Sequence, residues 1–313
     1  MSFNRIAIYG HRGWASSAIA AAMIASGAPI KVLYRPGSDI SSLPDSVPTV
    51  AVDLDDQGQV VGALQDVDIV ISLVGHEGVT RQHGLVKAIP ETGVRLFVPS
   101  DLAARYDEQG LRIPVNRNKY EVEDAARAAG ISMTVVLPGN FAEFALATPA
   151  MGVDRRNNRI LFSGDSERSV LNLCTRSYVA AAYASIFATT PIEDLQGRTI
   201  ALSEFRATGS EIATALKELH GSSTATKVQS TESTNAAIES ALATGSPFAL
   251  AFYCRKIWGT GQQAHMVGFD FWDVPGYNKA SLRDLIARGQ LQEYRQLPPA
   301  VLQFFEGLFE QCI

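Results

Sequence analysis

The sequence predicts an α/β fold: a doubly wound parallel sheet followed by a smaller mixed α/β substrate domain. In the first half, short apolar runs rich in β-branched residues alternate with helical patterns, which is typical of a parallel sheet with crossover helices. After about residue 150 this alternation stops and helices dominate. We therefore predict one domain over residues 1–150 and a second over 151–313.

The first domain is expected to hold six strands joined by four helices. The predicted strands cover residues 6–9, 31–34, 49–52, 68–74, 95–98 and 132–137. The predicted helices cover residues 15–26, 57–64, 80–89 and 114–129. In the second domain we expect a hairpin over 159–173 that turns at Ser163-Gly164-Asp165, a helix over 178–189, a strand over 199–202 and a flexible polar stretch over 222–233.

Composition and charge exclude several classes of function. The 313 residues carry a net charge of −5, so a dedicated nucleic-acid surface is not expected. The cysteines (Cys174, Cys254 and Cys312) have no metal-ligand spacing, and we expect reduced thiols and no metal site. No signal-peptide pattern opens the chain, and the apolar run 18–24 is too short to span a bilayer. We predict a cytoplasmic monomer or homodimer that binds a small molecule and no membrane.

A glycine turn follows the first predicted strand and opens the first helix. Gly10 and Gly13 allow a tight turn whose backbone can approach a pyrophosphate, and the phosphates then meet free N–H groups at the positive end of the helix. Ser16 stands where a third glycine is usual, and it is still small enough for close packing. The alternative is an ordinary strand–helix turn without a ligand. We predict a Rossmann-type dinucleotide site, with Trp14 and Ala15 beside the phosphates.

The choice of dinucleotide depends on the end of the second strand. A carboxylate there holds the ribose hydroxyls of NAD, whereas a basic residue favours the 2′-phosphate of NADP. Arg35 occupies this position, Arg12 lies nearby, and Ser38 can add a hydrogen bond. Asp53, after the third strand, either caps a turn or contacts the adenine edge. The sequence therefore predicts NADP(H).

These residues resemble those of the NmrA-like, isoflavone-reductase-like family of atypical short-chain dehydrogenases. The resemblance runs over about residues 4–146, and its most specific part is the motif 97–101, Phe-Val-Pro-Ser-Asp. The chain departs from the family in its glycine turn, where His11-Arg12 replaces a sequence that often ends in threonine. The resemblance implies a lysine beside the nicotinamide, at Lys119, and an interleaved second domain, so that part of 175–205 packs back on the sheet. We assign cofactor binding also to Ser72, Val74, Gly75, Gly139, Asn140 and Phe141.

Four residues are candidates for the chemistry. Lys119 can hold the nicotinamide ribose and move a proton, although most helix lysines simply face solvent. Ordinary short-chain dehydrogenases carry a tyrosine four residues before this lysine, but Val115 stands there. Tyr120 points about 100° away from Lys119 around the helix. His76 and Ser100 follow the fourth and fifth strands; His76 is either an acid or base or an ordinary loop residue, and Ser100 either binds substrate or caps a turn.

An aromatic stretch in the second domain leaves two interpretations open. Residues 268–273, Gly-Phe-Asp-Phe-Trp-Asp, either form the floor of an apolar substrate pocket or belong to the core or a domain seam. The same two interpretations apply to Tyr253, Trp258 and His265.

The leading function is an NADPH-dependent reductase of a small, aromatic or polyketide-like secondary metabolite. The first alternative is an NAD(P)-binding, redox-sensing regulator of the NmrA-like type that turns over no substrate. The second alternative is an isomerase or cyclase on the same fold that transfers no net hydride. Family resemblance alone does not separate the three, because one fold hosts many functions.

Overall fold

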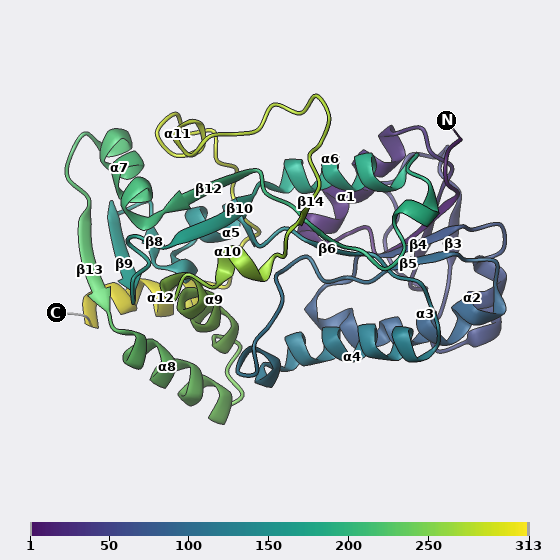
Figure 1. Cartoon of the computed structure of the whole chain (residues 1–313), viewed down its shortest axis with the longest axis horizontal. Coiled ribbons are helices and arrows are strands. Elements are labelled where there is room, and N and C mark those ends of the chain that lie inside the picture. The colour runs from purple at the N-terminus through teal and green to yellow at the C-terminus, as the bar shows by residue number, and fades with distance from the viewer. Residues whose placement is uncertain (1, 312–313) are drawn as a thin grey trace.

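A five-stranded parallel sheet forms the centre of the N-terminal half of the computed structural model, which describes residues 2–311 (Figure 1). The strand order is β3-β2-β1-β4-β5. The strands are β1 (Ile6–Tyr9), β2 (Ile30–Tyr34), β3 (Thr49–Ala51), β4 (Ile69–Ser72) and β5 (Leu96–Val98). The order reverses at β1, so the carboxyl ends of β1 and β4 lie side by side, and ligands of doubly wound sheets bind at such a point. The predicted fold class is confirmed.

The sheet is buried on both faces because its residues alternate between two apolar cores. Ile6 and Ile8 of β1 belong to one core, whereas Ala7 and Tyr9 belong to the other. Helices cover both faces of the sheet (Figure 1). The helices α1 (Trp14–Ala25) and α6 (Arg176–Phe187) pack on the first core, and α2 (Gln57–Ala63), α3 (Gln82–Ala88) and α4 (Pro114–Ala128) pack on the second.

Two segments of the C-terminal half lie against this N-terminal unit. Strand β6 (Val135–Leu137) pairs in parallel with β11 (Thr199–Ala201), and β11 pairs with β14 (Asp270–Phe271). A bridge between Phe97 and Met133 links this second sheet to β5. Helix α6 packs along α1.

The remaining elements form two small sheets covered by helices. The sheet orders are β12-β10-β7 and β13-β9-β8. The strands are β7 (Asn140–Phe141), β8 (Val153–Asp154), β9 (Arg159–Ser163), β10 (Val170–Cys174), β12 (Phe205–Thr208) and β13 (Ala225–Gln229). The helices are α5 (Ala142–Ala147), α7 (Gly209–His220), α8 (Thr231–Ala243), α9 (Ala249–Gly259), α10 (Gln263–Met266), α11 (Leu282–Leu285) and α12 (Pro299–Gln311). Short 3-10 turns are η1 (His76–Arg81), η2 (Ile89–Glu91), η3 (Gly110–Arg112), η4 (Pro149–Met151) and η5 (Ile192–Asp194).

The predicted hairpin over 159–173 is wrong. Strands β9 and β10 form at the expected places, but they belong to different sheets: β9 pairs with β8 and β13, and β10 pairs with β7 and β12. The intervening turn bonds to distant segments instead of closing on itself. The Gly164 N–H donates to the Gln229 carbonyl, and the Asp165 N–H donates to the Gly259 carbonyl. Local turn chemistry suggested a hairpin, but tertiary contacts separate the two strands.

The polar stretch over 222–233 is structured, contrary to the prediction. Residues 225–229 form β13, a parallel edge strand along β9, and Ser230 caps α8 through a hydrogen bond from the Ser233 N–H. The sequence is polar because an edge strand leaves most of its side chains in solvent. The low hydrophobicity of residues 222–233 therefore reflects an exposed edge strand and not a flexible linker.

The aromatic stretch 268–273 lies at the edge of the second sheet, where Phe271, Trp272 and Asp273 line a hollow together with Arg206 and Lys279. Phe269 is 80% exposed and Phe271 is 44% exposed, on the edge strand β14. Only Trp272 packs partly against the core, where its indole N–H donates to Ser185. Of the other aromatic candidates, Trp258 is buried in the second half of the chain.

Two further observations concern the described residues. Cys174 and Cys254 are free thiols, whereas Cys312 lies outside the described range. Within residues 2–311, each helix is too short or too polar to cross a membrane.

Candidate functional site

The glycine turn joins the end of β1 to α1 in close contact with β4. Gly10 has a φ of +90°, and a Cβ there would lie 3.0 Å from the carbonyl of Leu73. The Ser16 hydroxyl donates to the same Leu73 carbonyl at 2.6 Å and thereby ties α1 to the end of β4. Gly13 is the N-cap of α1 and provides no side-chain cap. The first N–H groups of the helix are therefore left for another acceptor.

A groove of about 330 Å³ opens over this turn. Seven residues predicted for the cofactor line it: Gly10, Arg12, Gly13, Arg35, Ser38, Val74 and Gly75. Arg81, at the end of η1, also lines it and escaped the sequence analysis, although the turn after β4 lies at the same sheet edge. Three arginines face a single lining carboxylate, Glu77, so the groove is suited to an anion.

Eight other residues predicted for the cofactor do not line the groove, and four of them line no neighbouring cavity either. Ser72 is fully buried under the groove, and the Asp53 carboxylate accepts the N–H of Asp55 in a turn. Ala15 lies inside α1. The Trp14 ring turns the other way and contacts Phe141 at 5.3 Å and Tyr294 at 4.8 Å between ring centres.

A second cavity of about 350 Å³ lies beside the groove and contains two of the four predicted chemical residues. His76, Lys119, Gly139, Asn140 and Phe141 all line it. Its walls are aromatic and come from distant parts of the chain: Tyr106, Phe144, Phe248, Tyr253, Tyr294 and Phe305. The two hollows are adjacent in the fold, because Gly75 of the groove precedes His76, and Trp14 contacts Phe141.

Lys119 is held at the cavity by a buried polar cluster. Its Nζ donates to the carbonyl of Asp101 and lies 3.4 Å from the Asp101 carboxylate. The Tyr106 hydroxyl donates to that carboxylate at 3.1 Å, and burial and then the Asp101 charge raise the pKa of Tyr106. Arg105 binds both oxygens of Glu123 at 2.8 and 2.9 Å. The lysine is thus a positioned ammonium, and its solvent-facing alternative is excluded by its 9% exposure.

The two remaining chemical candidates lie outside the cavity. The Ser100 hydroxyl donates to the Val74 carbonyl at 2.7 Å, and its N–H donates to Gln82 at 2.8 Å, so Ser100 fastens the ends of β4 and β5. The Tyr120 side chain is 50% exposed and is not part of the lining, as its angle from Lys119 around the helix requires.

His76 lines the cavity with a lowered pKa, which favours the loop-residue alternative over a cationic acid at neutral pH. Loss of solvation at the cavity wall, and then the charges of Lys119 and Arg295, together lower its pKa to about 4. The imidazole is therefore uncharged at pH 7 and cannot act there as a cationic acid. The residue as a whole is exposed, and partial desolvation of its ring at the cavity together with the nearby cations explains the shift.

This depressed pKa predicts a specific loss of stability in acid. In the unfolded chain His76 has a pKa near 6.5, whereas in the folded chain its pKa is about 4. Between these two pH values the unfolded chain therefore binds a proton that the folded chain does not bind. The contribution of uncharged His76 to the free energy of unfolding is fully present above pH 6.5 and is lost as the pH falls from 6.5 towards 4. His76→Gln should unfold at a urea midpoint that changes less between pH 7.5 and 5 than that of the parent. Equal changes in both proteins would contradict the shift.

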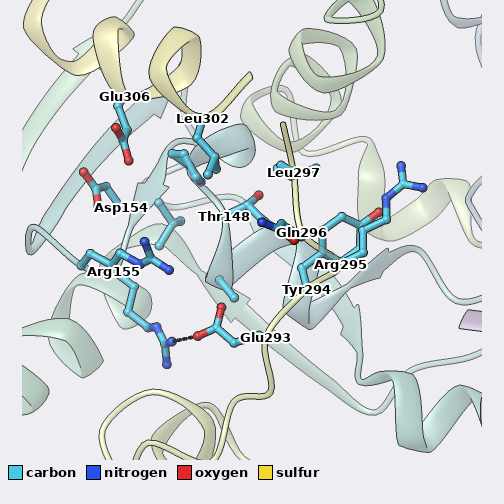
Figure 2. A pocket seen from close by; sticks show the side chains of 14 residues that line it. Thr148, Asp154, Arg155, Glu293, Tyr294, Arg295, Gln296, Leu297, Leu302 and Glu306 are labelled. Atoms are coloured by element: carbon cyan, nitrogen blue, oxygen red, sulfur yellow. Dashed lines mark hydrogen bonds and ion pairs between the residues drawn. The ribbon is translucent and has the colours of Figure 1, made fainter. Parts of the chain in front are cut away.

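A third cavity, of about 430 Å³, lies on the other side of the segment 293–298 (Figure 2). Tyr294, Arg295 and Leu297 line both this cavity and the one at Lys119, so the segment forms their common wall. An ion pair of 3.1 Å joins Arg155 to Glu293 at the edge of this third cavity, drawn as the dashed line in Figure 2. None of the predicted site residues reaches it.

Comparison with known proteins gives a consistent result. The family described as the NmrA-like family matches residues 2–251. An isoflavone reductase homologue of Zea mays is 31% identical over 156 residues, which is 46% of this chain and 50% of that protein. A phenylcoumaran benzylic ether reductase of Ginkgo biloba is 27% identical over 188 residues, 54% and 61% of the two chains. The chain thus spans about half to three fifths of the length of these curated relatives.

The solved structures extend the likeness to the second half. The binary complex of leucoanthocyanidin reductase with NADPH from Vitis vinifera has a TM-score of 0.75 at 18% identity and covers 92% of this chain and 100% of that one. At this identity the likeness concerns the fold alone. The family match over most of the sequence, together with the glycine turn and the positions of Asp101 and Lys119, shows that the chain belongs to the NmrA-like family.

Proposed function

We propose that this protein is an NADPH-dependent reductase of a small aromatic metabolite. The observation that carries the proposal is the junction of two hollows: an arginine-lined groove over a glycine turn, and an aromatic cavity that contains the ammonium of Lys119. A cavity of about 350 Å³ with apolar walls and few polar groups suits a ligand of one or two rings. The relatives' names, which include reductases of phenylpropanoid compounds, support this class.

The residues of the groove fit a phosphorylated dinucleotide. The uncapped first turn of α1 would receive the pyrophosphate, and the close packing of Gly10 and Ser16 on Leu73 provides the flat turn that this requires. Arg35, with Arg12 and Ser38, would hold a ribose phosphate. When bound, NADPH supplies a hydride to an acceptor carbon in the neighbouring cavity.

The chain's own residues then serve the reaction in three ways. The aromatic walls keep water from the acceptor and orient its ring. Lys119 holds a proton at Nζ beside the cavity, where it can stabilise or protonate an oxygen that gains negative charge. Asp101 and Tyr106 fix the direction of that ammonium through the contacts described above.

Cofactor choice tests the role of Arg35. Arg35→Ala should lower the preference for NADPH over NADH about tenfold, because a charge-assisted bond to the 2′-phosphate is worth roughly 1.5 kcal/mol at an exposed site. Calorimetry with both dinucleotides measures the preference. Arg127→Ala, on the surface of α4, is the matched control and should leave it unchanged. A parent protein that binds NADH as tightly as NADPH would contradict the role of Arg35.

Isotope transfer tests the function itself. NADPH deuterated at C4 should label the product when the protein is incubated with aromatic ketones, enones and benzylic ethers, read by mass spectrometry. Tight NADPH binding with every compound unchanged would instead favour the redox-sensing regulator. Product that forms with no deuterium and no loss of NADPH would favour the isomerase or cyclase.

A further inference from the structure

We infer that Gln263 fixes the side-chain amide of Asn140 with its N–H groups towards the aromatic cavity, so that the cavity selects ligands that carry an acceptor oxygen. The inference rests on the proposed function, since it concerns the substrate class of the same cavity. It follows from a chain of hydrogen bonds in which every donor and acceptor is determined.

The orientation of Gln263 is set by the backbone. Gln263 lies in α10 and is fully buried. Its Oε1 accepts the N–H of Asn172 at 2.7 Å, and its Nε2 donates to the carbonyl of Asn172 at 3.1 Å. A backbone N–H can only donate and a carbonyl can only accept, so the two ends of this amide cannot be exchanged.

The orientation of Asn140 follows from that of Gln263. The same Nε2 of Gln263 donates to the side-chain oxygen of Asn140 at 2.9 Å. Because Oδ1 is used in this way, Nδ2 is left to face other partners, and Asn140 lines the cavity. Cys254, another lining residue, accepts a hydrogen bond from this amide; burial nevertheless raises the pKa of the thiol to about 11, so it stays protonated.

The surrounding backbone is shaped for this arrangement. Asn172 Nδ2 donates to the carbonyls of Pro138 at 3.2 Å and Leu202 at 2.9 Å, which holds the network between β6, β10 and β11. Gly139 has a φ of +73°, and a Cβ there would lie 2.7 Å from Gln263 Nε2. A glycine before Asn140 is therefore needed for Gln263 to reach it.

The rest of the cavity favours the same ligand class. Among its described lining residues, the charged side chains are Lys119, Arg105 and Arg295, and none is a carboxylate. The amide of Asn140 and the ammonium of Lys119 thus offer donors at the polar end of an aromatic cavity. A carbonyl, ether or phenolate oxygen on an aromatic ring can accept the N–H groups that Cys254 and Asp101 leave available, whereas a ligand that only donates cannot pair with them.

A pair of simple probes tests the inference. Acetophenone offers only an acceptor and indole only a donor, and both are small aromatic compounds. Ligand-observed NMR titration should show that the parent protein binds acetophenone about tenfold more tightly than indole. Asn140→Asp, which replaces the donor amide with an acceptor, should reverse this order. Equal binding of the two probes by the parent protein, or an Asp variant that keeps the parent's preference, would overturn the inference.

The positioning role of Gln263 has its own variant and control. Gln263→Met keeps the side-chain length and removes the amide, so Asn140 can rotate and the preference for acetophenone should fall at least threefold. Gln262→Met makes the same change at an exposed neighbour and should preserve the preference. A merely structural role of Gln263 would weaken both probes by the same factor, and that outcome would refute the assignment.

Titration with and without saturating NADP⁺ separates this inference from the proposed function. If the protein prefers acetophenone but binds no NADP⁺, the proposed reductase function is contradicted and the role of Asn140 is supported. If the protein binds NADP⁺ but shows no preference between the probes, the role of Asn140 is contradicted and the reductase function is not.

Discussion

Replacing Lys119 by Met should lower kcat by roughly 10²- to 10⁴-fold while NADPH affinity changes much less. The reason is that Lys119 lines the aromatic cavity and not the arginine-lined groove, so under the proposed function its loss removes a proton donor from the acceptor and leaves the dinucleotide contacts in place. Met retains the apolar stem that α4 buries and removes only the charge. Steady-state kinetics and calorimetry on both proteins measure the two effects.

The controls for Lys119 address folding and alternatives. Breaking a buried pair with Asp101 costs stability, roughly 3–5 kcal/mol when the remaining charge stays buried, so Tm is measured alongside. Lys87→Ala, on the exposed side of α3, should leave both kcat and affinity unchanged. A folded Lys119→Met protein with full turnover would remove the catalytic assignment. If the parent protein turns over no substrate and Lys119→Met only weakens NADPH binding, the result would support the redox-sensing regulator instead.

Gly13→Val should abolish dinucleotide binding, with a loss of at least 100-fold in affinity, while the fold remains. Gly13 caps α1 without a side chain, and a Cβ there already meets the Ser16 hydroxyl at 2.9 Å. A branched side chain at residue 13 would cover the backbone N–H groups that a pyrophosphate needs. The phosphate oxygens would then lose several charge-assisted hydrogen bonds, and the dinucleotide would bind much more weakly. Calorimetry with NADPH is the measurement.

A matched glycine separates the site effect from a general one. Gly58 also lies in the first turn of a helix, α2, where a Cβ would have only an ordinary contact of 3.5 Å. Gly58→Val should therefore bind NADPH like the parent protein. Normal binding by a folded Gly13→Val protein would mean that the phosphates bind elsewhere.

The sheet and the arginine-lined groove were largely predictable because their signals are local. Buried parallel strands are continuous apolar runs, and glycine and proline residues mark where these runs end. The turn Gly10–Gly13 and the basic residue Arg35 each follow a strand directly, so topology alone places them at one sheet edge. Arg81 comes from a 3-10 turn without periodicity, and nothing in its neighbourhood separates it from an ordinary exposed arginine.

The cavity walls and the second half were less predictable, because their contacts join residues far apart in the chain. Phe248, Tyr294 and Phe305 line the same cavity as Lys119 only in the folded protein. The local sequence pattern around each residue does not indicate this shared position. The failed hairpin at 159–173 has the same origin, since strand partners are chosen by tertiary packing. The depressed pKa of His76 likewise depends on burial and on Arg295, more than two hundred residues later.

The packing of α6 along α1 has a consequence for biosynthesis. Ile19 and Met23 of α1 are fully buried against a core that includes Tyr178 and Tyr183 of α6, and β6 gains its neighbour β11 only at Thr199. A nascent chain on the ribosome therefore presents an uncovered apolar helix face until about two thirds of the protein has been translated. We expect the nascent chain to be most prone to aggregation during that interval, because the α1 face and the groove beside it reach their native packing only after α6 has been made.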